Sequence, residues 1–217
     1  MDNALLPTVL PGVLPTDLSG LRSRDADASV VVAWGLDNFR SLGAPTNATY
    51  ARLPQIVPEL TARPLASLSC GAYYCLALVP GEGVYGWGAA AHGELGDVGA
   101  PAVGAPRLLP FTAKKLIVAV AAGRAHALAL RYEGVVLAWG DNRRGQLGAP
   151  GQLGSQIRSL RPFPSEVPER VTQVAAGGAR SLALGESGAL WGWGGAAGDG
   201  DDASEAAAAA GAEAAVP

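Results

Sequence analysis

The sequence predicts an all-β fold, a β-propeller array of about four blades, because several residue pairs recur with one period. Tryptophan-glycine pairs recur at intervals of 53, 52 and 54 residues, and leucine-glycine pairs begin eight residues after each of the first three tryptophans. A small residue followed by glycine precedes each of the last three tryptophans. A period near fifty residues is typical of such arrays. The repeat positions are Trp34, Trp87, Trp139 and Trp193, then Leu42, Leu95 and Leu147, then Gly71, Gly123 and Gly177.

The composition agrees with one repeat array and excludes some partners. The chain has 217 residues with 30 glycines and 16 prolines, which suit many tight turns and few long helices. A net charge of −3 offers no basic face, so we expect no nucleic-acid partner. Apolar runs stay well short of the ~20 residues of a membrane span. The first residues lack the basic region of a signal peptide. We therefore expect an intracellular, cytoplasmic protein without a membrane span.

The two cysteines, Cys70 and Cys75, lie five residues apart. This spacing matches neither a CxxC metal half-site nor a disulfide framework. We therefore predict buried, reduced thiols, which also favours an intracellular compartment.

The repeat marks divide the chain into three parts. Residues 1–28 carry no mark and form a Pro/Gly-rich arm and linker, because prolines exclude a regular helix there. Residues 29–194 form the repeat domain. Residues 195–217 are an alanine-rich, acidic, low-complexity tail, for which we expect disorder. The marks themselves fall at 29–43, 65–96, 115–148 and 171–194.

Two copies need comment. The first copy contains only the second half of the repeat, because the strand pair that precedes the tryptophan in later copies is absent. After it, residues 44–64 are expected to be loop and spacer, with a short strand at Ile56-Val57 confined by prolines. In the third copy, alanine content would allow a helix over 116–130, but the central Gly123 and the valines favour two strands.

The third copy resembles the repeat of the regulator of chromosome condensation family. The resemblance covers about three quarters of the chain, from Ser29 to Gly194. Members of this family are seven-bladed β-propellers with four-stranded antiparallel blades. The resemblance therefore implies an incomplete propeller of about four such blades, flanked by irregular tails. The residues that carry it are Val120, Ala122, Gly123, His126, Leu128, Leu130, Gly134, Trp139, Gly140, Asn142, Gly145, Gln146, Leu147 and Gly148.

This chain also departs from the family pattern. The GxxH element survives only at 123–126, and the neighbouring copies have Tyr74 and Arg180 in place of the histidine. The NxxGQLG element is intact only at 142–148, and it decays to DNFRSLG at 37–43 and AAHGELG at 90–96.

The motif residues are explained by the fold without any catalytic chemistry. Tryptophan buries a large area between blades, while Asn142 and Gln146 can hydrogen-bond to loop backbone. His126 occupies the histidine position of the repeat, and His92 has no metal-ligand spacing to another residue. We therefore expect no enzyme activity, catalytic residue, cofactor, metal or small-molecule substrate.

An incomplete ring leaves blade faces and strand edges open, and these must be covered. The predicted function is a non-catalytic protein-protein interaction or scaffold subunit of a larger assembly, whose protein partners cover the open blade faces. The alternative is a guanine-nucleotide exchange factor for a small GTPase, the best-known activity of the family, which needs a full propeller face. The plant UV-B photoreceptors are similar in fold, but their Gly-Trp-Arg-His-Thr element is replaced here by GAYYC, GRAHA and GGARS.

Candidate partner-binding residues are loop residues that the fold does not require. Aromatic residues and arginines are enriched where binding energy concentrates. The candidates are Phe39, Arg40, Tyr73, Arg143 and Arg144.

Overall fold

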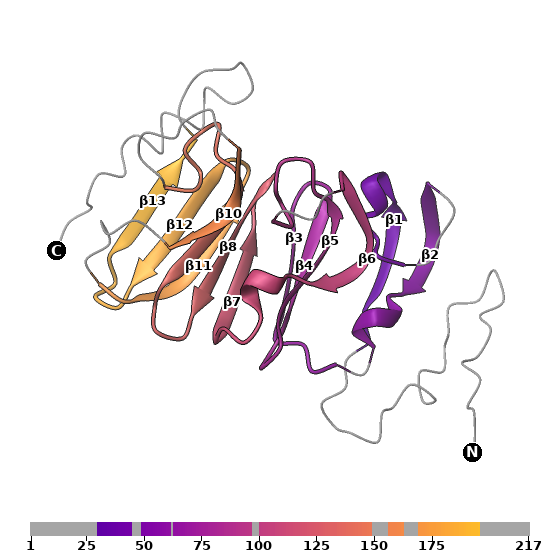
Figure 1. Ribbon diagram of the computed structural model, residues 1–217, viewed down its shortest axis with the longest axis horizontal. Helices are drawn as coiled ribbons and strands as arrows, with labels where there is room; N and C mark the ends of the chain where they lie inside the picture. The colour runs from indigo at the N-terminus through magenta and orange to yellow at the C-terminus, as the bar shows by residue number, and fades with distance from the viewer. Residues whose placement is uncertain are drawn as a thin grey trace.

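The described part of the chain forms four antiparallel sheets that follow one another in chain order (Figure 1). The computed structural model describes residues 30–44, 49–61, 63–96, 100–148, 156–162 and 169–195. Within these ranges the strand order is β1-β2, β3-β4-β5-β6, β10-β9-β8-β7 and β11-β12-β13. The all-β prediction is therefore confirmed, and each sheet is one blade or part of one.

The blades are built from short strands joined mostly by tight turns. The first blade has β1 (Val32–Leu36) and β2 (Tyr50–Ile56), and the second has β3 (Ser67–Cys70), β4 (Tyr74–Val79), β5 (Gly83–Ala89) and β6 (Ala102–Leu108). The third has β7 (Ile117–Ala122), β8 (His126–Arg131), β9 (Val136–Asp141) and β10 (Gln156–Pro162). The fourth has β11 (Val171–Gly177), β12 (Arg180–Gly185) and β13 (Leu190–Gly194). Short 3-10 turns lie at η2 (Asn38–Arg40), η3 (Pro58–Leu60) and η4 (Pro110–Thr112).

Two of the four sheets have the four strands that the resemblance implied. The first copy contributes only the second half of a blade, as predicted, but its fourth strand, β2, lies where the sequence predicted loop. The last blade has three strands within the described residues. In the third copy, β7 and β8 confirm two strands in place of an alanine-rich helix. The N-terminal arm and the tail from residue 196 onward lie outside the described residues.

The prediction of loop and spacer over residues 44–64 is wrong. The centre of this stretch is the seven-residue strand β2, which begins at Tyr50 and ends at Ile56, and Val57 lies outside it. The strand includes Pro54, whose lack of an N–H is tolerated because β2 is an edge strand of its sheet. The other fourth strands, β6 and β10, are also edge strands and also contain proline.

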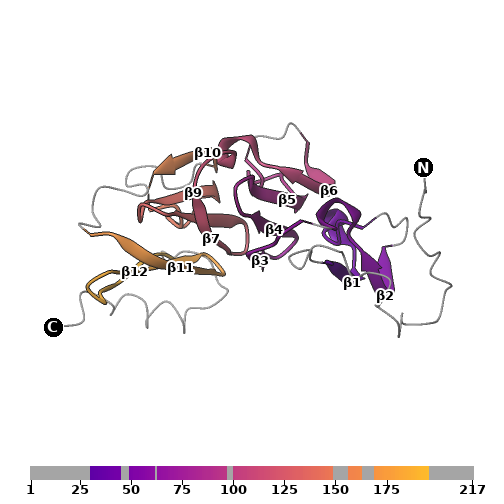
Figure 2. The same ribbon diagram turned by 90° about the horizontal axis from the view of Figure 1, so that it is seen from below.

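The core lies between consecutive sheets, which explains why the strands are apolar on both faces. One cluster joins blades two and three and includes Leu76, Leu78, Val120 and Trp139. A second cluster joins blades three and four, and a third joins blades one and two. Figure 2 shows that the row of sheets curves, so that both end sheets lie toward the same side. Among the described residues, no helix has the length and apolar character needed to cross a membrane.

The cysteine prediction is also wrong, because Cys70 and Cys75 form a disulfide. The two residues lie directly opposite each other in the β3–β4 pair. Cross-strand partners approach closely enough for such a bond when their side chains share a face. A five-residue spacing is therefore compatible with a disulfide when a hairpin turn lies between the cysteines.

Candidate partner-binding site

Each complete blade carries a tight loop after its third strand, held by its own side chains. In the third blade, Asn142 Oδ1 accepts a hydrogen bond from the Leu147 N–H at 2.9 Å. Gln146 Oε1 accepts one from the Arg144 N–H at 2.8 Å. The predicted backbone-bonding role of both residues is therefore confirmed.

Each of the two decayed loops keeps one of these bonds through an acidic side chain. Asp37 Oδ1 accepts a hydrogen bond from the Leu42 N–H at 2.9 Å, as Asn142 does in the third blade. Glu94 Oε2 accepts one from the His92 N–H at 2.8 Å, which is the role of Gln146. A carboxylate oxygen accepts as well as an amide oxygen, so these substitutions preserve the loop shape.

This loop shape presents one carbonyl oxygen to the tryptophan of the next blade. Trp87 Nε1 donates to Ser41 O at 2.9 Å, Trp139 Nε1 to Glu94 O at 2.7 Å, and Trp193 Nε1 to Gln146 O at 2.9 Å. Each acceptor immediately precedes the leucine of a leucine-glycine pair. The two strongest sequence marks therefore form one contact between adjacent blades.

The residue at the histidine position of the repeat also contacts the adjacent blade. His126 Nε2 lies 2.8 Å from Ser181 Oγ, and that hydroxyl donates to Gln146 O at 2.8 Å. Because the hydroxyl proton is used on Gln146, we assign the neutral tautomer with the proton on Nε2. Burial lowers the pKa of His126 to about 4, although the charge of Asp141 opposes this. His126 is therefore a buried, hydrogen-bonded imidazole.

Tyr74 holds the equivalent place in the second blade. It is buried, and its hydroxyl donates toward the main-chain oxygens of Gly123 and His126 in the third blade. Burial and the charge of Glu94 raise the pKa of Tyr74 well above its usual value, so it remains a neutral donor. Tyr74 is thus a structural residue, whereas its neighbour Tyr73 is exposed.

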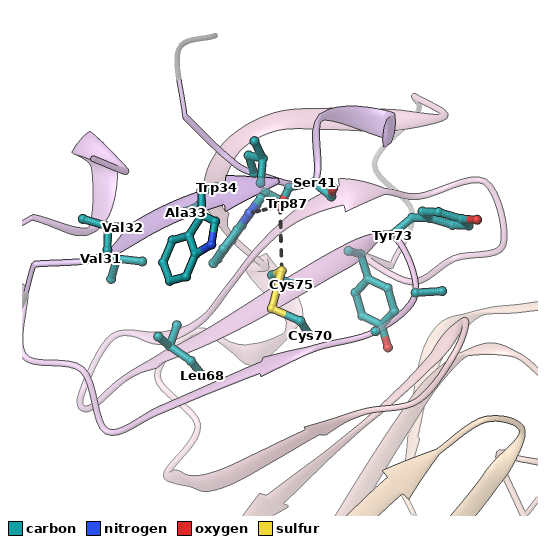
Figure 3. A pocket seen from close by; sticks show the side chains of 14 residues that line it. Val31, Val32, Ala33, Trp34, Ser41, Leu68, Cys70, Tyr73, Cys75 and Trp87 are labelled. Atoms are coloured by element: carbon teal, nitrogen blue, oxygen red, sulfur yellow. Dashed lines mark hydrogen bonds between the residues drawn. A yellow bond between two sulfur atoms is a disulfide. The ribbon is translucent and has the colours of Figure 1, made fainter. Parts of the chain in front are cut away.

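The first blade breaks the pattern, because no strand pair precedes β1 within the described residues. The side chain of Trp34 is 61% exposed, whereas Trp87 and Trp139 at the same repeat position are 3% and 0% exposed. A groove of about 380 Å³ lies between β1 and the β3–β4 hairpin. Figure 3 shows Trp34 on one side of this groove and Leu68 on the other, with the disulfide between Cys70 and Cys75 in its wall. We call this feature the first-blade groove.

An aromatic pair lies beside the first-blade groove. The ring centroids of Phe39 and Tyr73 are 5.2 Å apart, and both side chains are exposed. Phe39 has φ of 56°, which is unfavourable for a bulky residue. Residues with strained backbone cluster at functional sites, and aromatic residues are enriched where binding energy concentrates. The structure therefore brings together two of the five candidate binding residues.

The three arginine candidates lie elsewhere or have other contacts. The side chain of Arg40 lies against Gly104 in β6. Arg143 has a structural role that the sequence did not reveal, because its guanidinium binds Asp141 through contacts of 2.9–3.0 Å. Burial alone would raise the pKa of Asp141, but the hydrogen bonds from Arg143 hold it below its usual value. Arg144 is half-buried in the same loop, in the third blade.

Other chemistry is sparse in the described part of the chain. No group of three or more His, Cys, Asp or Glu side chains there could hold a metal ion. His92 pairs with Glu94, with Nδ1 3.1 Å from Oε1. Sequence reasoning did not identify Trp34 and Leu68 as site residues. The signal was nevertheless present, because the first copy visibly lacks the strand pair that would cover them.

The chain matches the Regulator of chromosome condensation (RCC1) repeat at residues 29–78, 82–130 and 133–184. A second description of the same repeat matches residues 117–146. The matches cover both complete blades and most of each partial one.

Several whole proteins are similar over the same region. The probable E3 ubiquitin-protein ligase HERC6 of Homo sapiens is 35% identical over 170 residues, which are 73% of this chain and 16% of that protein. The mitochondrial RCC1 domain-containing protein RUG3 of Arabidopsis thaliana is 35% identical over 66% of this chain and 32% of its own length. The ultraviolet-B receptor UVR8 of Arabidopsis thaliana is 34% identical over 76% of this chain and 37% of its own. The chain thus spans well under half of these relatives.

Two solved structures share the fold. Human WBSCR16 superimposes with a TM-score of 0.64 at 21% identity, over 77% of this chain and 45% of that one. Yeast RCC1 (Prp20), in its complex with Kap60, superimposes with a TM-score of 0.62 at 24% identity, over 76% of this chain and 39% of that one.

Proposed function

Because the chain belongs to the regulator of chromosome condensation repeat family, we propose that it is a non-catalytic protein-interaction subunit of a larger assembly. The observation that carries the proposal is the exposure of Trp34, at a position that is buried in the two complete blades. Large apolar side chains left open beside a groove mark sites where another protein binds.

The chemistry of the described residues supports a binding role. The repeat's polar groups are used in contacts between blades, such as those of His126 and Ser181, or within a loop, such as that of Asn142. What remains exposed near the first-blade groove is mostly apolar or aromatic. The likeness to yeast RCC1 is in fold, and the structure of that protein has it bound to another protein, Kap60.

The test starts from the native full-length protein isolated from its source. We expect it in a stoichiometric complex much heavier than the chain's 21.9 kDa. With the copurifying protein identified, its affinity is then measured for the variants Phe39→Ala and Tyr73→Ala. Each is expected to weaken binding about tenfold or more.

The matched control is Tyr132→Ala. Tyr132 is equally aromatic and exposed, but it lies in a turn of the third blade beside Arg170. This variant should bind as the unaltered protein does. A stable monomer with no stoichiometric companion would contradict the proposal.

The second candidate function is guanine-nucleotide exchange on a small GTPase, the best-known activity of the family. It is tested by mixing the purified chain with GTPases loaded with a fluorescent nucleotide. Accelerated nucleotide release would replace the scaffold proposal, and an unchanged rate would remove this candidate.

A further inference from the structure

We propose that the free edge of β1 binds an extended segment of a different protein, which adds to β1 as an antiparallel strand. The segment carries a small residue followed by Leu-Ala-Leu. This inference rests on the proposed function and specifies how the partner is held. It concerns a main-chain contact, in addition to the aromatic pair beside it.

The edge of β1 has hydrogen-bonding groups that face away from β2. Val57 N–H donates to Val31 O at 2.9 Å, and Asp37 N–H donates to Thr49 O at 2.9 Å, so Val31 and Asp37 face β2. Successive residues of a strand alternate in direction, so the main-chain groups of Val32 face the opposite side.

The complete blades show that the tryptophan and the second residue after it face this same side. In β5, the Ala89 N–H donates to Tyr73 O at 2.8 Å, toward β4, the second strand of that blade. In β9, the Asp141 N–H donates to Ala125 O at 2.9 Å, toward the middle strand β8. The equivalent residue of the first blade is Leu36, two after Trp34. Within the described residues, β1 pairs with β2 alone. Val32, Trp34 and Leu36 therefore offer a free edge suited to strand addition.

The second strands of the three later blades, β4, β8 and β12, define the side chains that fit. In each blade, the residue opposite the tryptophan is small: Cys75 faces Trp87, Ala127 faces Trp139, and Ser181 faces Trp193. A Leu-Ala-Leu sequence follows immediately in all three strands. A larger residue opposite the indole would occupy the space that the ring fills between blades.

The first-blade groove provides the place for the leucines. In the second blade, Leu76 and Leu78 pack in one cluster with Val120 of the third blade, which is 8% exposed. Leu68 occupies the place of Val120 one blade earlier, since each lies three residues before the paired glycine, yet Leu68 is 51% exposed. Leucines of an added strand would bury it as Leu76 and Leu78 bury Val120. The groove thus continues an interface already built between the blades.

No strand in the described part of this chain can supply the segment. Leu-Ala-Leu occurs three times in the sequence, at 76–78, 128–130 and 182–184. Each occurrence lies in a strand that already has a neighbour on both edges, so a folded second copy has none to offer. The residues just before β1, at 22–28, read RSRDADA and carry four charges where the apolar pattern is needed.

The experiment uses the full chain and a synthetic peptide of residues 115–131, KLIVAVAAGRAHALALR, which carries the first two strands of a complete blade. The peptide should bind and slow amide hydrogen exchange at Val32, Trp34 and Leu36 at least tenfold. It should also shift tryptophan fluorescence to the blue, and Trp34→Phe should abolish that shift. A peptide of the same composition in scrambled order is the control probe.

Two variants at one position separate strand addition from simple apolar contact. Val32→Pro removes an N–H that faces the free edge, and it leaves the β1–β2 hydrogen bonds in place. Val32→Thr keeps the N–H and the branched shape. We expect Val32→Pro to weaken binding of both the peptide and the copurifying protein tenfold or more, while Val32→Thr binds normally. Circular dichroism and thermal unfolding of both variants check that the fold is retained.

Each other outcome overturns the inference in a distinct way. If the native complex forms and both Val32 variants bind equally, the interaction function stands and strand addition is wrong. If β1 amides are already protected and deletion of residues 1–28 exposes them, the chain covers its own edge. If self-association is lost in Val32→Pro, a second copy is the occupant. If no native complex forms, the proposed function itself fails.

Discussion

The indole Nε1 of Trp139 donates a hydrogen bond to the main-chain oxygen of Glu94, 2.7 Å away in the preceding blade. Trp139 is fully buried, and the ring of Phe111 packs against it at 5.4 Å between centroids. The tryptophan therefore adds a directional bond to the apolar contact between blades.

Removing this bond should destabilise the protein measurably. Trp139→Phe keeps an aromatic ring but leaves the Glu94 oxygen without its donor, and it should lower the free energy of unfolding by about 1–3 kcal/mol. Trp139→Ala also leaves a cavity and should cost about 3–5 kcal/mol. Urea denaturation measures both. Trp34→Phe is the control, since its exposed ring predicts a change within about 0.5 kcal/mol.

The repeat glycines that follow a small residue, such as Gly123 and Gly177, should respond differently to substitution by alanine. A methyl group at Gly123 would overlap the ring of His126, whereas one at Gly177 would meet nothing within 4 Å. Gly123→Ala should therefore lower the free energy of unfolding by about 1–3 kcal/mol. Gly177→Ala should be neutral, or it should stabilise the protein by up to about 1 kcal/mol, because alanine lowers the conformational entropy of the unfolded chain. Equal thermal midpoints for the two variants would show that the ring of His126 does not pack over Gly123 as described.

Stability should fall in mild acid because of His126. Burial lowers its pKa from 6.5 to about 4 in the folded protein, so the unfolded chain binds more protons between these values. The contribution of His126 is complete above pH 6.5 and is lost as the pH falls toward 4, by up to about 3 kcal/mol. Unfolding free energies measured at several pH values test this. His126→Gln should flatten the profile between pH 4 and 6.5, and an unchanged slope would assign the effect to other groups.

The disulfide should stabilise the second blade modestly. Cys70 and Cys75 close a short loop, for which the chain-entropy estimate is about 2 kcal/mol. The unaltered protein should unfold at lower urea concentration when a thiol reductant is present. The double variant Cys70→Ala and Cys75→Ala should unfold at that lower concentration with or without reductant. A midpoint insensitive to reductant in the unaltered protein would mean that the disulfide is not formed in solution.

The parts of the fold that recur were predictable from sequence. The tryptophan, leucine and glycine marks identified the blades, because each mark has one structural duty that repeats. The fourth strands were missed since β2, β6 and β10 are edge strands that tolerate proline and need no apolar alternation. Their identity depends on the neighbouring strand, which local sequence does not encode.

The candidate site was predictable only in part. Phe39 and Tyr73 were identified as exposed aromatics, but their proximity depends on how blades one and two pack. Arg143 was misjudged as free of structural duty, because its pairing with Asp141 depends on the turn between them. The disulfide was missed for a similar reason, since spacing along the chain does not reveal strand register.

The sequential contact between sheets also determines how the protein comes apart. Strand β7 contacts β4 of the blade before it and β11 of the blade after it. In such linear arrays, stability approximates a sum of unit terms and nearest-neighbour couplings, so opening spreads inward from the ends. The first and last sheets of the described array should therefore open at lower free energy than the two in the middle. Any protein that occupies the β1 edge would, by the same coupling, raise the cooperativity of the whole array.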